Sequence, residues 1–270
     1  MKKSLVYMVI TAMITMLVAV TGCSKHETEA ATDATVVVLD KSASITAFET
    51  ALESEVGVEG LETLMLCAYD CLNALPAEEL SVAEIETLTY VREEEYLAHD
   101  VYQALYALYP VPVFNFISNS ESLHAYAMKV LLDKYNLPDP AADHQPGVFV
   151  NPQIQQLYTD LVAFGSQSIG NALTVGATIE DVDIADLIDH LENDIDNQDL
   201  GYAIELLYKG SRNHMRAFNA HLVFRNITYT PQYIPQELFD QITGSAWEIG
   251  QGFCVCQCTA TTSAAATFTE

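Results

Sequence analysis

The most informative stretch of the chain is residues 117–135, which read ISNSESLHAYAMKVLLDKY. Within it one set of residues recurs at steps of three and four: Ile117, Glu121, His124, Met128, Leu131 and Tyr135. This spacing places the whole set on one face of a helix. The face is mostly apolar and should be buried, yet a buried carboxylate is costly unless it is neutralised or paired. The stretch therefore predicts a core helix that carries a polar site.

Three other stretches repeat this pattern of an apolar stripe interrupted by polar side chains. Their members are Leu88, Val91, Glu95, Ala98, Tyr102 and Leu105; Leu173, Ala177, Glu180, Ile184, Leu187 and Leu191; and Ile204, Leu207, Ser211, His214, Phe218 and His221. Together the four stripes direct three glutamates and two histidines into one interior. A metal ion offsets the cost of burying them, and this ligand set suits iron or manganese better than structural zinc. The pattern predicts an all-α helical bundle that binds a metal.

The first 22 residues have the layout of a secretory signal peptide. Lys2 and Lys3 precede an apolar run over 5–20, and Val-Thr-Gly then leads directly into Cys23. Small residues before a cysteine resemble a bacterial lipobox, so we expect residues 1–22 to be a lipoprotein signal peptide and Cys23 to be lipidated. The expected location is the cell envelope, with a membrane as partner through that anchor. An ordinary signal peptide and an uncleaved anchor helix are the alternatives.

The composition is strongly acidic, with 11 basic and 37 acidic residues among 270. A surface of that charge repels nucleic acid and anionic lipid headgroups, so no nucleic acid is expected as a partner. It would concentrate cations nearby, which suits a metal protein. A metal-free exported protein from a salty habitat would have the same charge.

Six cysteines suit an oxidising, exported setting. With Cys23 acylated, five remain: Cys67, Cys71, Cys254, Cys256 and Cys258. We expect disulfides between the 67–71 and 254–258 clusters, with one thiol left over. A strained local bridge between Cys67 and Cys71 and soft-metal binding by the second cluster are the alternatives. The sequence leaves the connectivity open.

Composition and periodicity divide the chain into five parts. They are the signal peptide, a flexible tether at 23–55, a short helical cysteine-containing segment at 56–80, a bundle at 81–226 and a C-terminal extension at 227–270. Ser81 and Glu84 form a capping-box signature ahead of the first bundle helix. Helices are expected to about 108 and at about 115–135 and 153–164. After a break at 165–166, further helices are expected to about 192, at 200–224 and near 236–242. The connection between the second and third bundle helices is long.

Four segments taken in order resemble one known family. They are REEEYLAHDVY at 92–102, SESLH at 120–124, GATIEDVDI at 176–184 and GSRNHMRAF at 210–218. As a set they resemble the ferritin-like DUF2202 family, over about residues 81–224. The resemblance implies a ferritin-like four-helix bundle with a central metal site. The ligands that it implies are Glu95, Glu121, His124, Glu180 and His214.

The fourth helix departs from the di-iron enzymes of the rubrerythrin type. Those proteins carry Glu-x-x-His there, whereas this chain has Ser211-x-x-His214. Asp183 or Glu94 could supply the absent carboxylate; otherwise the site holds one metal or a more open pair. Three further expectations concern neighbouring residues. The Tyr102 hydroxyl finds a partner in the core, His221 lies at the bundle rim, and Arg212 and Arg216 pair with acids of a neighbouring helix.

The function predicted is that of an exported, lipid-anchored metal protein whose cofactor is iron, with manganese and zinc as alternatives. A di-iron site would suit oxidoreductase chemistry with O2 or peroxide. A non-catalytic iron-sequestering lipoprotein and a metal-free structural module are the alternative functions, and a homo-oligomer is compatible with each. Hydrolysis by Ser211 and His214 is disfavoured because residues one turn apart on a buried stripe leave little room for substrate.

Overall fold

The computed structural model describes residues 58–248, with side chains from residue 65 onward. This part of the chain contains seven helices and no strand. The helices are α3 (Val58–Ala74), α4 (Val82–Leu108), α5 (Pro112–Lys134), α6 (Pro152–Gly165), α7 (Ile169–Asn193), α8 (Gln198–Phe224) and α9 (Gln236–Gly244). The expected signal peptide, the lipidated Cys23 and the tether lie outside the described residues. No helix between residues 58 and 248 is both long enough and apolar enough to span a membrane.

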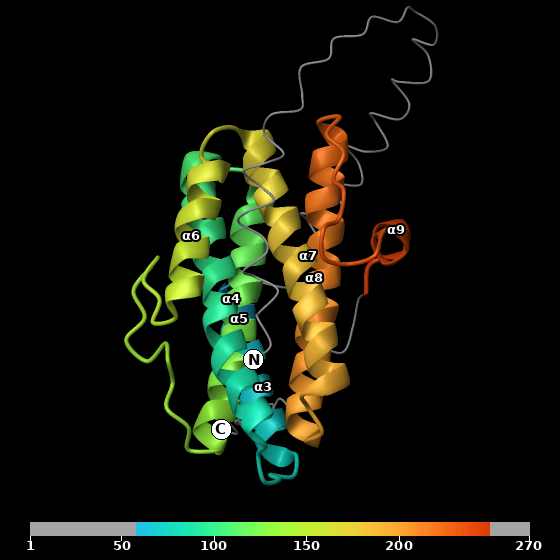
Figure 1. Ribbon diagram of the computed structural model, residues 1–270. Helices are drawn as coiled ribbons and strands as arrows, with labels where there is room; N and C mark the ends of the chain where they lie inside the picture. The colour runs from blue at the N-terminus through green and yellow to red at the C-terminus, as the bar shows by residue number, and fades with distance from the viewer. Residues whose placement is uncertain (1–57, 249–270) are drawn as a thin grey trace, which may run out of the picture.

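Four long helices, α4, α5, α7 and α8, form a bundle (Figure 1). Residues 109–111 join α4 to α5, and residues 194–197 join α7 to α8. Such short connections make each pair antiparallel neighbours, and the two pairs pack against each other through α5–α8 and α4–α7. The all-α bundle expected from the sequence is confirmed. Its long connection, 135–168, contains α6, which packs on α4 and α7.

The predicted capping box begins α4. The Glu84 backbone N–H donates to the Ser81 hydroxyl over 3.1 Å, and the Glu84 carboxylate accepts from the Ser81 N–H over 2.8 Å. The other Glu84 oxygen accepts from the Asn197 N–H over 3.0 Å. One side chain thereby caps α4 and fixes the turn between α7 and α8.

The helix bounds agree with the sequence prediction except at the start of α5. That helix begins at Pro112, three residues earlier than expected. Pro112 lies in the expected gap between the first two bundle helices, residues 109–114. Proline suits the first helical turn because its fixed φ is already helical and its missing N–H is not needed there, so Pro112 starts the next helix.

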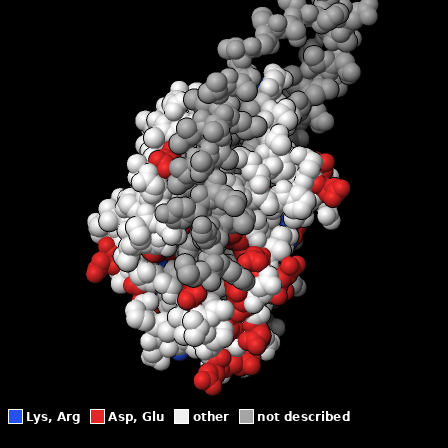
Figure 2. Space-filling view, in the orientation of Figure 1, with Lys and Arg blue, Asp and Glu red and all other residues white. Residues whose placement is uncertain are grey.

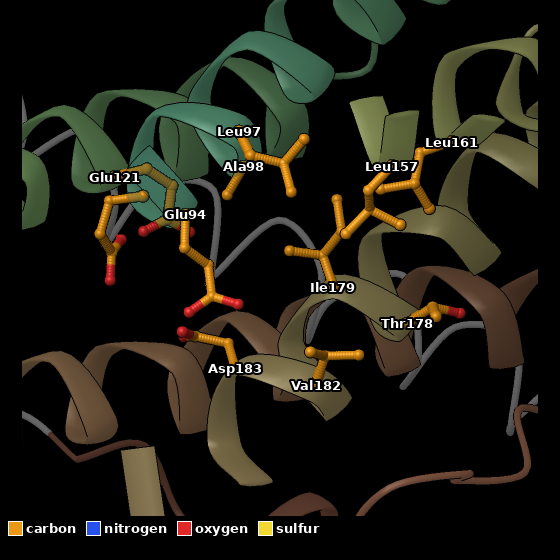
Figure 3. A pocket seen from close by; sticks show the side chains of 11 residues that line it. Glu94, Leu97, Ala98, Glu121, Leu157, Leu161, Thr178, Ile179, Val182 and Asp183 are labelled. Atoms are coloured by element: carbon orange, nitrogen blue, oxygen red, sulfur yellow. The ribbon is translucent and has the colours of Figure 1, made fainter. Parts of the chain in front are cut away.

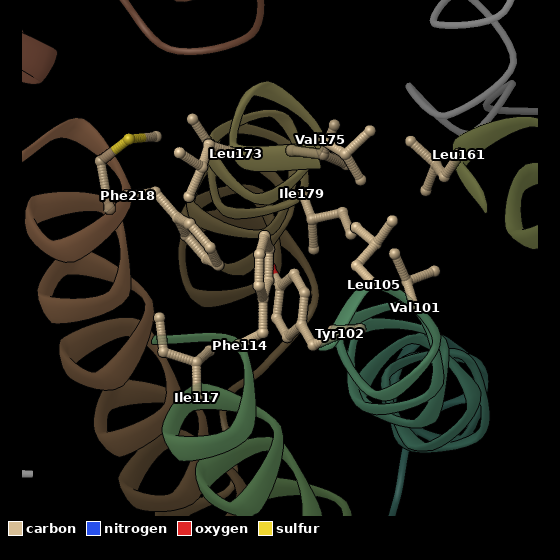
Figure 4. Close-up of a cluster of buried hydrophobic side chains, with 14 of the residues drawn as sticks. Val101, Tyr102, Leu105, Phe114, Ile117, Leu161, Leu173, Val175, Ile179 and Phe218 are labelled. Atoms are coloured by element: carbon tan, nitrogen blue, oxygen red, sulfur yellow. The ribbon is translucent and has the colours of Figure 1, made fainter. Parts of the chain in front are cut away.

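Two apolar clusters lie at different levels along the bundle. One is centred on Tyr102, Phe114 and Phe218, whose rings pack with centroids 5.2–6.5 Å apart (Figure 4). The second contains Leu88, Met128, Leu131, Leu187, Ile204 and Leu207. On each of the four helices the expected metal ligands fall between residues of these two clusters. The polar site is thus enclosed by apolar layers above and below.

The segment after α8 folds back onto the bundle, held by the buried Asp181. This carboxylate accepts the Tyr229 hydroxyl over 2.9 Å, the Gln232 N–H over 2.6 Å and the Ile234 N–H over 2.9 Å. Tyr229, Ile234 and residues of α9 join the apolar cluster that is centred on Tyr102, Phe114 and Phe218. The pKa of Asp181 is raised by burial even though these donors oppose the shift.

Arg212 and Arg216 pair with an acid, but not with one on a neighbouring helix. Both guanidinium groups contact the Glu248 carboxylate, which follows α9 in the chain. These bonds lower the pKa of Glu248 to about 2. The expectation failed because periodicity along α8 could not show that a segment more than 30 residues later returns to this surface.

His221 is buried and does not lie at the rim. The buried face of α8 continues to Leu222, two residues before the helix ends at Phe224. Burial, assisted by the nearby Arg225 charge, lowers the pKa of His221 to about 4. The imidazole is therefore neutral at ordinary pH.

The α3 helix packs against α5 and carries Cys67 and Cys71. Both sulfur atoms are disulfide-bonded, and both side chains are buried. Cys254, Cys256 and Cys258 lie outside the described residues, so the expected pairing between the two clusters stays a prediction.

Candidate metal centre

The structure brings all five predicted ligands together in the bundle interior. Each of the four long helices contributes: Glu95 from α4, Glu121 and His124 from α5, Glu180 from α7 and His214 from α8. None of the five is more than 6% exposed. The i, i+3 spacing of Glu121 and His124 puts both on one helix face.

Glu121 lies at the centre of the group, with one oxygen toward each histidine. Its Oε2 is 2.8 Å from Nδ1 of His124, and its Oε1 is 2.9 Å from Nδ1 of His214. The two imidazole rings are near parallel, with centroids 5.6 Å apart. A carboxylate in this position can bridge two ions, with one imidazole on each.

Each of the two remaining glutamates lies beside one of the histidines. Glu95 Oε2 lies 3.3 Å from Nδ1 of His124, and Glu180 Oε2 lies 3.3 Å from Nδ1 of His214. Glu121 thus belongs to two donor groups, one with Glu95 and His124 and one with Glu180 and His214, each with ligand atoms within 4.8 Å of one another. The geometry suits a dinuclear site with a shared carboxylate.

Neighbouring residues fix the orientation of these side chains. The far nitrogen of His214, Nε2, lies 3.0 Å from the Ser120 hydroxyl. The Tyr102 hydroxyl has the core partner that was expected, and this partner is the Glu180 carboxylate, to which it donates. Supporting contacts of this kind orient metal-binding side chains and tune their affinity.

Gly210 on α8 provides the space for the His124 ring. A Cβ at this position would lie 2.5 Å from Cε1 and 2.6 Å from Nε2 of the imidazole. Glycine in the middle of a helix costs roughly 1 kcal/mol relative to alanine. The close approach of His124 to the α8 backbone explains why the chain accepts that cost.

The charges of the five groups are strongly interdependent. Burial raises the pKa of Glu95 to about 7, against the opposing effect of His124. Burial disfavours the imidazolium of His214, but Glu121 and Glu180 more than reverse this and raise its pKa to about 10. Burial would also raise the pKa of Glu121, yet the two histidines lower it. A bound cation would satisfy the carboxylates in place of protons on the imidazoles.

Unpartnered polar atoms show that these residues fit a metal. Among the described side chains, Glu95 Oε1, Glu180 Oε2 and His214 Nδ1 are buried without a hydrogen bond of acceptable geometry. Buried polar groups normally have a partner. Carboxylate oxygen and imidazole nitrogen are donors that iron and manganese accept, so metal ions would supply the missing interactions.

Asp183 and Glu94 lie beside this centre but outside both donor groups. Ser211 donates its hydroxyl to one oxygen of Asp183, across from α8 to α7. Ser211 thus positions a carboxylate next to the centre. Glu94 and Asp183 line a small cavity of about 20 Å³, shown in Figure 3.

The same cavity has an apolar wall that joins three helices. Its apolar residues come from α4, α6 and α7: Leu97, Ala98, Leu157, Leu161, Ile179 and Val182. A volume of this size holds about one water molecule. The cavity therefore connects the carboxylates to a confined, mostly apolar space beneath α6.

Sequence reasoning missed Ser120, Gly210 and the α6 wall. Ser120 precedes Glu121 directly, and Gly210 is a glycine inside a strongly periodic helix, which is a sign of close packing. Nothing in the sequence of α6 indicated which helices it would cover.

Comparisons with a family profile, with known sequences and with solved structures agree with one another. Residues 84–246 match the profile of a family described as uncharacterized protein domain DUF2202. An uncharacterized protein of Methanocaldococcus jannaschii, MJ0754, is 48% identical over 179 residues, covering 66% of this chain and 96% of the relative. The crystal structure of MJ0754 superimposes with a TM-score of 0.63 over 64% of this chain and 99% of that one.

Proposed function

The chain belongs to the DUF2202 family, and we propose that it holds a dinuclear metal centre, with iron as the metal, in a ferritin-like bundle. The observation that carries the proposal is the position of Glu121 between the Nδ1 atoms of His124 and His214. Two separate donor groups that share one carboxylate are the arrangement expected for a pair of ions.

The roles of the residues follow from their positions. Glu121 would bridge the two ions, Glu95 and Glu180 would each bind one of them, and each histidine would bind through Nδ1. Tyr102 would keep Glu180 oriented through its hydroxyl, and Ser120 would hold the far side of His214. The apolar clusters above and below exclude bulk water from these bonds.

We propose oxidoreductase chemistry as the activity of this centre. An iron pair bound there would supply electrons to O2 or peroxide. The chain would provide a dry pocket, fixed ligands and a confined cavity of about 20 Å³ beside them. The described residues 58–248 contain no electron relay, so a separate reductant would be required.

One observation favours a second candidate function, iron sequestration without turnover. Ser211 stands where a fourth carboxylate of the centre is expected in rubrerythrin-type enzymes, and it donates to Asp183. A centre with one carboxylate fewer would bind iron with less charge compensation. Under this alternative the chain would bind iron but would not consume peroxide or O2 catalytically.

Export and lipid anchoring remain part of the proposal. They are supported by the basic, apolar and Cys23-containing pattern at the start of the sequence and by the disulfide bonding of Cys67 and Cys71. Disulfides persist mainly in oxidising compartments. Labelling cells with a radioactive fatty acid would show incorporation into the wild-type protein and none into Cys23→Ser; equal incorporation would exclude an anchor at this cysteine.

Metal content tests the centre itself. Protein lacking its first 23 residues, purified anaerobically, loaded with Fe2+ and desalted, should retain about two irons per chain. Glu121→Ala and His124→Ala should lose them, whereas Glu205→Ala, which removes an exposed acid of α8, should not. No retained metal in the wild type would exclude the proposed function. Turnover of peroxide or O2 by the loaded protein then separates the enzyme from the sequestering protein.

A further inference from the structure

Glu94 of α4 and Asp183 of α7 face each other next to the candidate centre (Figure 3). Their exposed fractions are 6% and 8%. Glu94 Oε2 and Asp183 Oδ1 are both buried without a hydrogen-bond partner among the described residues. The second oxygen of Asp183 is held by Ser211, which fixes the direction of the carboxylate.

Among residues 65–248, no basic side chain forms an ion pair with Glu94 or Asp183. Arg92, the one arginine of α4, is committed to Asp139 and to the Ala125 carbonyl. Two facing buried carboxylates are stable only if a proton or a cation lies between them.

An acidic stripe leads from this pair toward the surface. Asp183, Asp186 and Asp189 follow at i, i+3 spacing along α7, so they lie near one another on the helix. Asp183 and Asp186 are buried and Asp189 is exposed. Figure 2 shows acidic side chains gathered on the lower half of the molecule, with few basic ones among them. A field of this sign attracts cations toward the inner pair.

We propose that Glu94 and Asp183 bind a divalent cation at a site of their own, beside the two ions of the central site. The inference rests on the proposed function, because the central ions explain why Glu95, Glu121 and Glu180 are not available to this third ion. Oxygen-only ligands suit hard divalent cations, which complete their coordination with water. The adjoining cavity has room for one water.

Manganese stoichiometry tests the third site without reference to activity. Equilibrium dialysis of the protein lacking its first 23 residues against excess Mn2+ should give three ions per wild-type chain. The near-isosteric variants Glu94→Gln and Asp183→Asn should each give two. Asp189→Asn, which removes the same charge at the exposed end of the stripe, should still give three. Circular dichroism and thermal unfolding verify that each variant is folded.

The outcomes distinguish this site from the central one. Glu121→Ala should lose the two central ions and keep one, bound by Glu94 and Asp183. If wild type and Glu94→Gln both bind two, the carboxylates share a proton and the third site is wrong, while the central site stands. If Glu94→Gln loses every ion, Glu94 belongs to the central site and the inference is also wrong. No binding by the wild type would overturn both proposals.

Discussion

Replacing Gly210 with alanine should push the His124 ring out of position without removing any metal ligand. The new Cβ would lie 2.5 Å from Cε1 of His124 and 2.6 Å from Nε2. Carbon atoms in contact normally stay about 3.5–4.0 Å apart, so the imidazole must move by roughly 1 Å. Ligand distances in a metal site are held to within about 0.2 Å. We therefore expect Gly210→Ala to weaken metal binding by at least about 10-fold, the loss typical when the support of a ligand is removed.

The same substitution should leave the metal-free protein folded. Alanine gains roughly 1 kcal/mol of helix propensity over glycine, which offsets part of the about 1–3 kcal/mol cost of overpacking. Urea unfolding of the metal-free protein measures this balance, and a chelator-competition titration measures metal affinity.

Gly201→Ala is the matched control on the same helix. A Cβ at Gly201 would have its nearest neighbour at 3.9 Å, an ordinary contact. It should leave metal affinity unchanged and should not destabilise the protein. If Gly210→Ala binds metal as tightly as Gly201→Ala, the reasoning about His124 is refuted.

Three further predictions concern residues around the centre. Ser120→Ala removes the partner of His214 Nε2 and should weaken metal binding about 10-fold in a chelator competition; unchanged affinity would show that the serine does not orient the ring. Asp181→Asn places an amide N–H group toward donors of residues 229–234 and should cost about 2–3 kcal/mol in urea unfolding, with faster proteolysis after α8; an unchanged midpoint would refute that anchoring role. His221 has its folded pKa lowered from 6.5 to about 4, so its contribution is complete above pH 6.5 and is lost as pH falls through about 4. This contribution should amount to roughly 2–3 kcal/mol. Between pH 6.5 and pH 4 the free energy of unfolding of His221→Asn should therefore fall by that much less than that of the wild type; parallel plots of the free energy of unfolding against pH would contradict the assignment.

The sequence was sufficient to predict the bundle and the convergence of five polar side chains. Steps of three and four residues assign each side chain to a helix face, and burying four such faces together forces Glu95, Glu121 and Glu180 toward one interior. The pattern could also predict the capping box at Ser81, because that signal is local.

Other features depend on contacts between distant segments and could not be predicted. The return of residues 227–248 to the bundle relies on Asp181, whose hydrogen-bond partners lie about 50 residues later. The burial of His221 depends on how far the buried face of α8 extends. The direction of Glu94 within a run of three glutamates depends on the rotation of α4 in the bundle, which periodicity gives only approximately.

The measurement that tests the central claim most directly is anomalous X-ray diffraction from crystals of the iron-loaded protein. Two iron peaks should flank Glu121, about 3.5–4 Å apart, one beside His124 and one beside His214. A single peak that contacts both histidines, or no peak near Glu121, would contradict a centre in which this carboxylate bridges two ions.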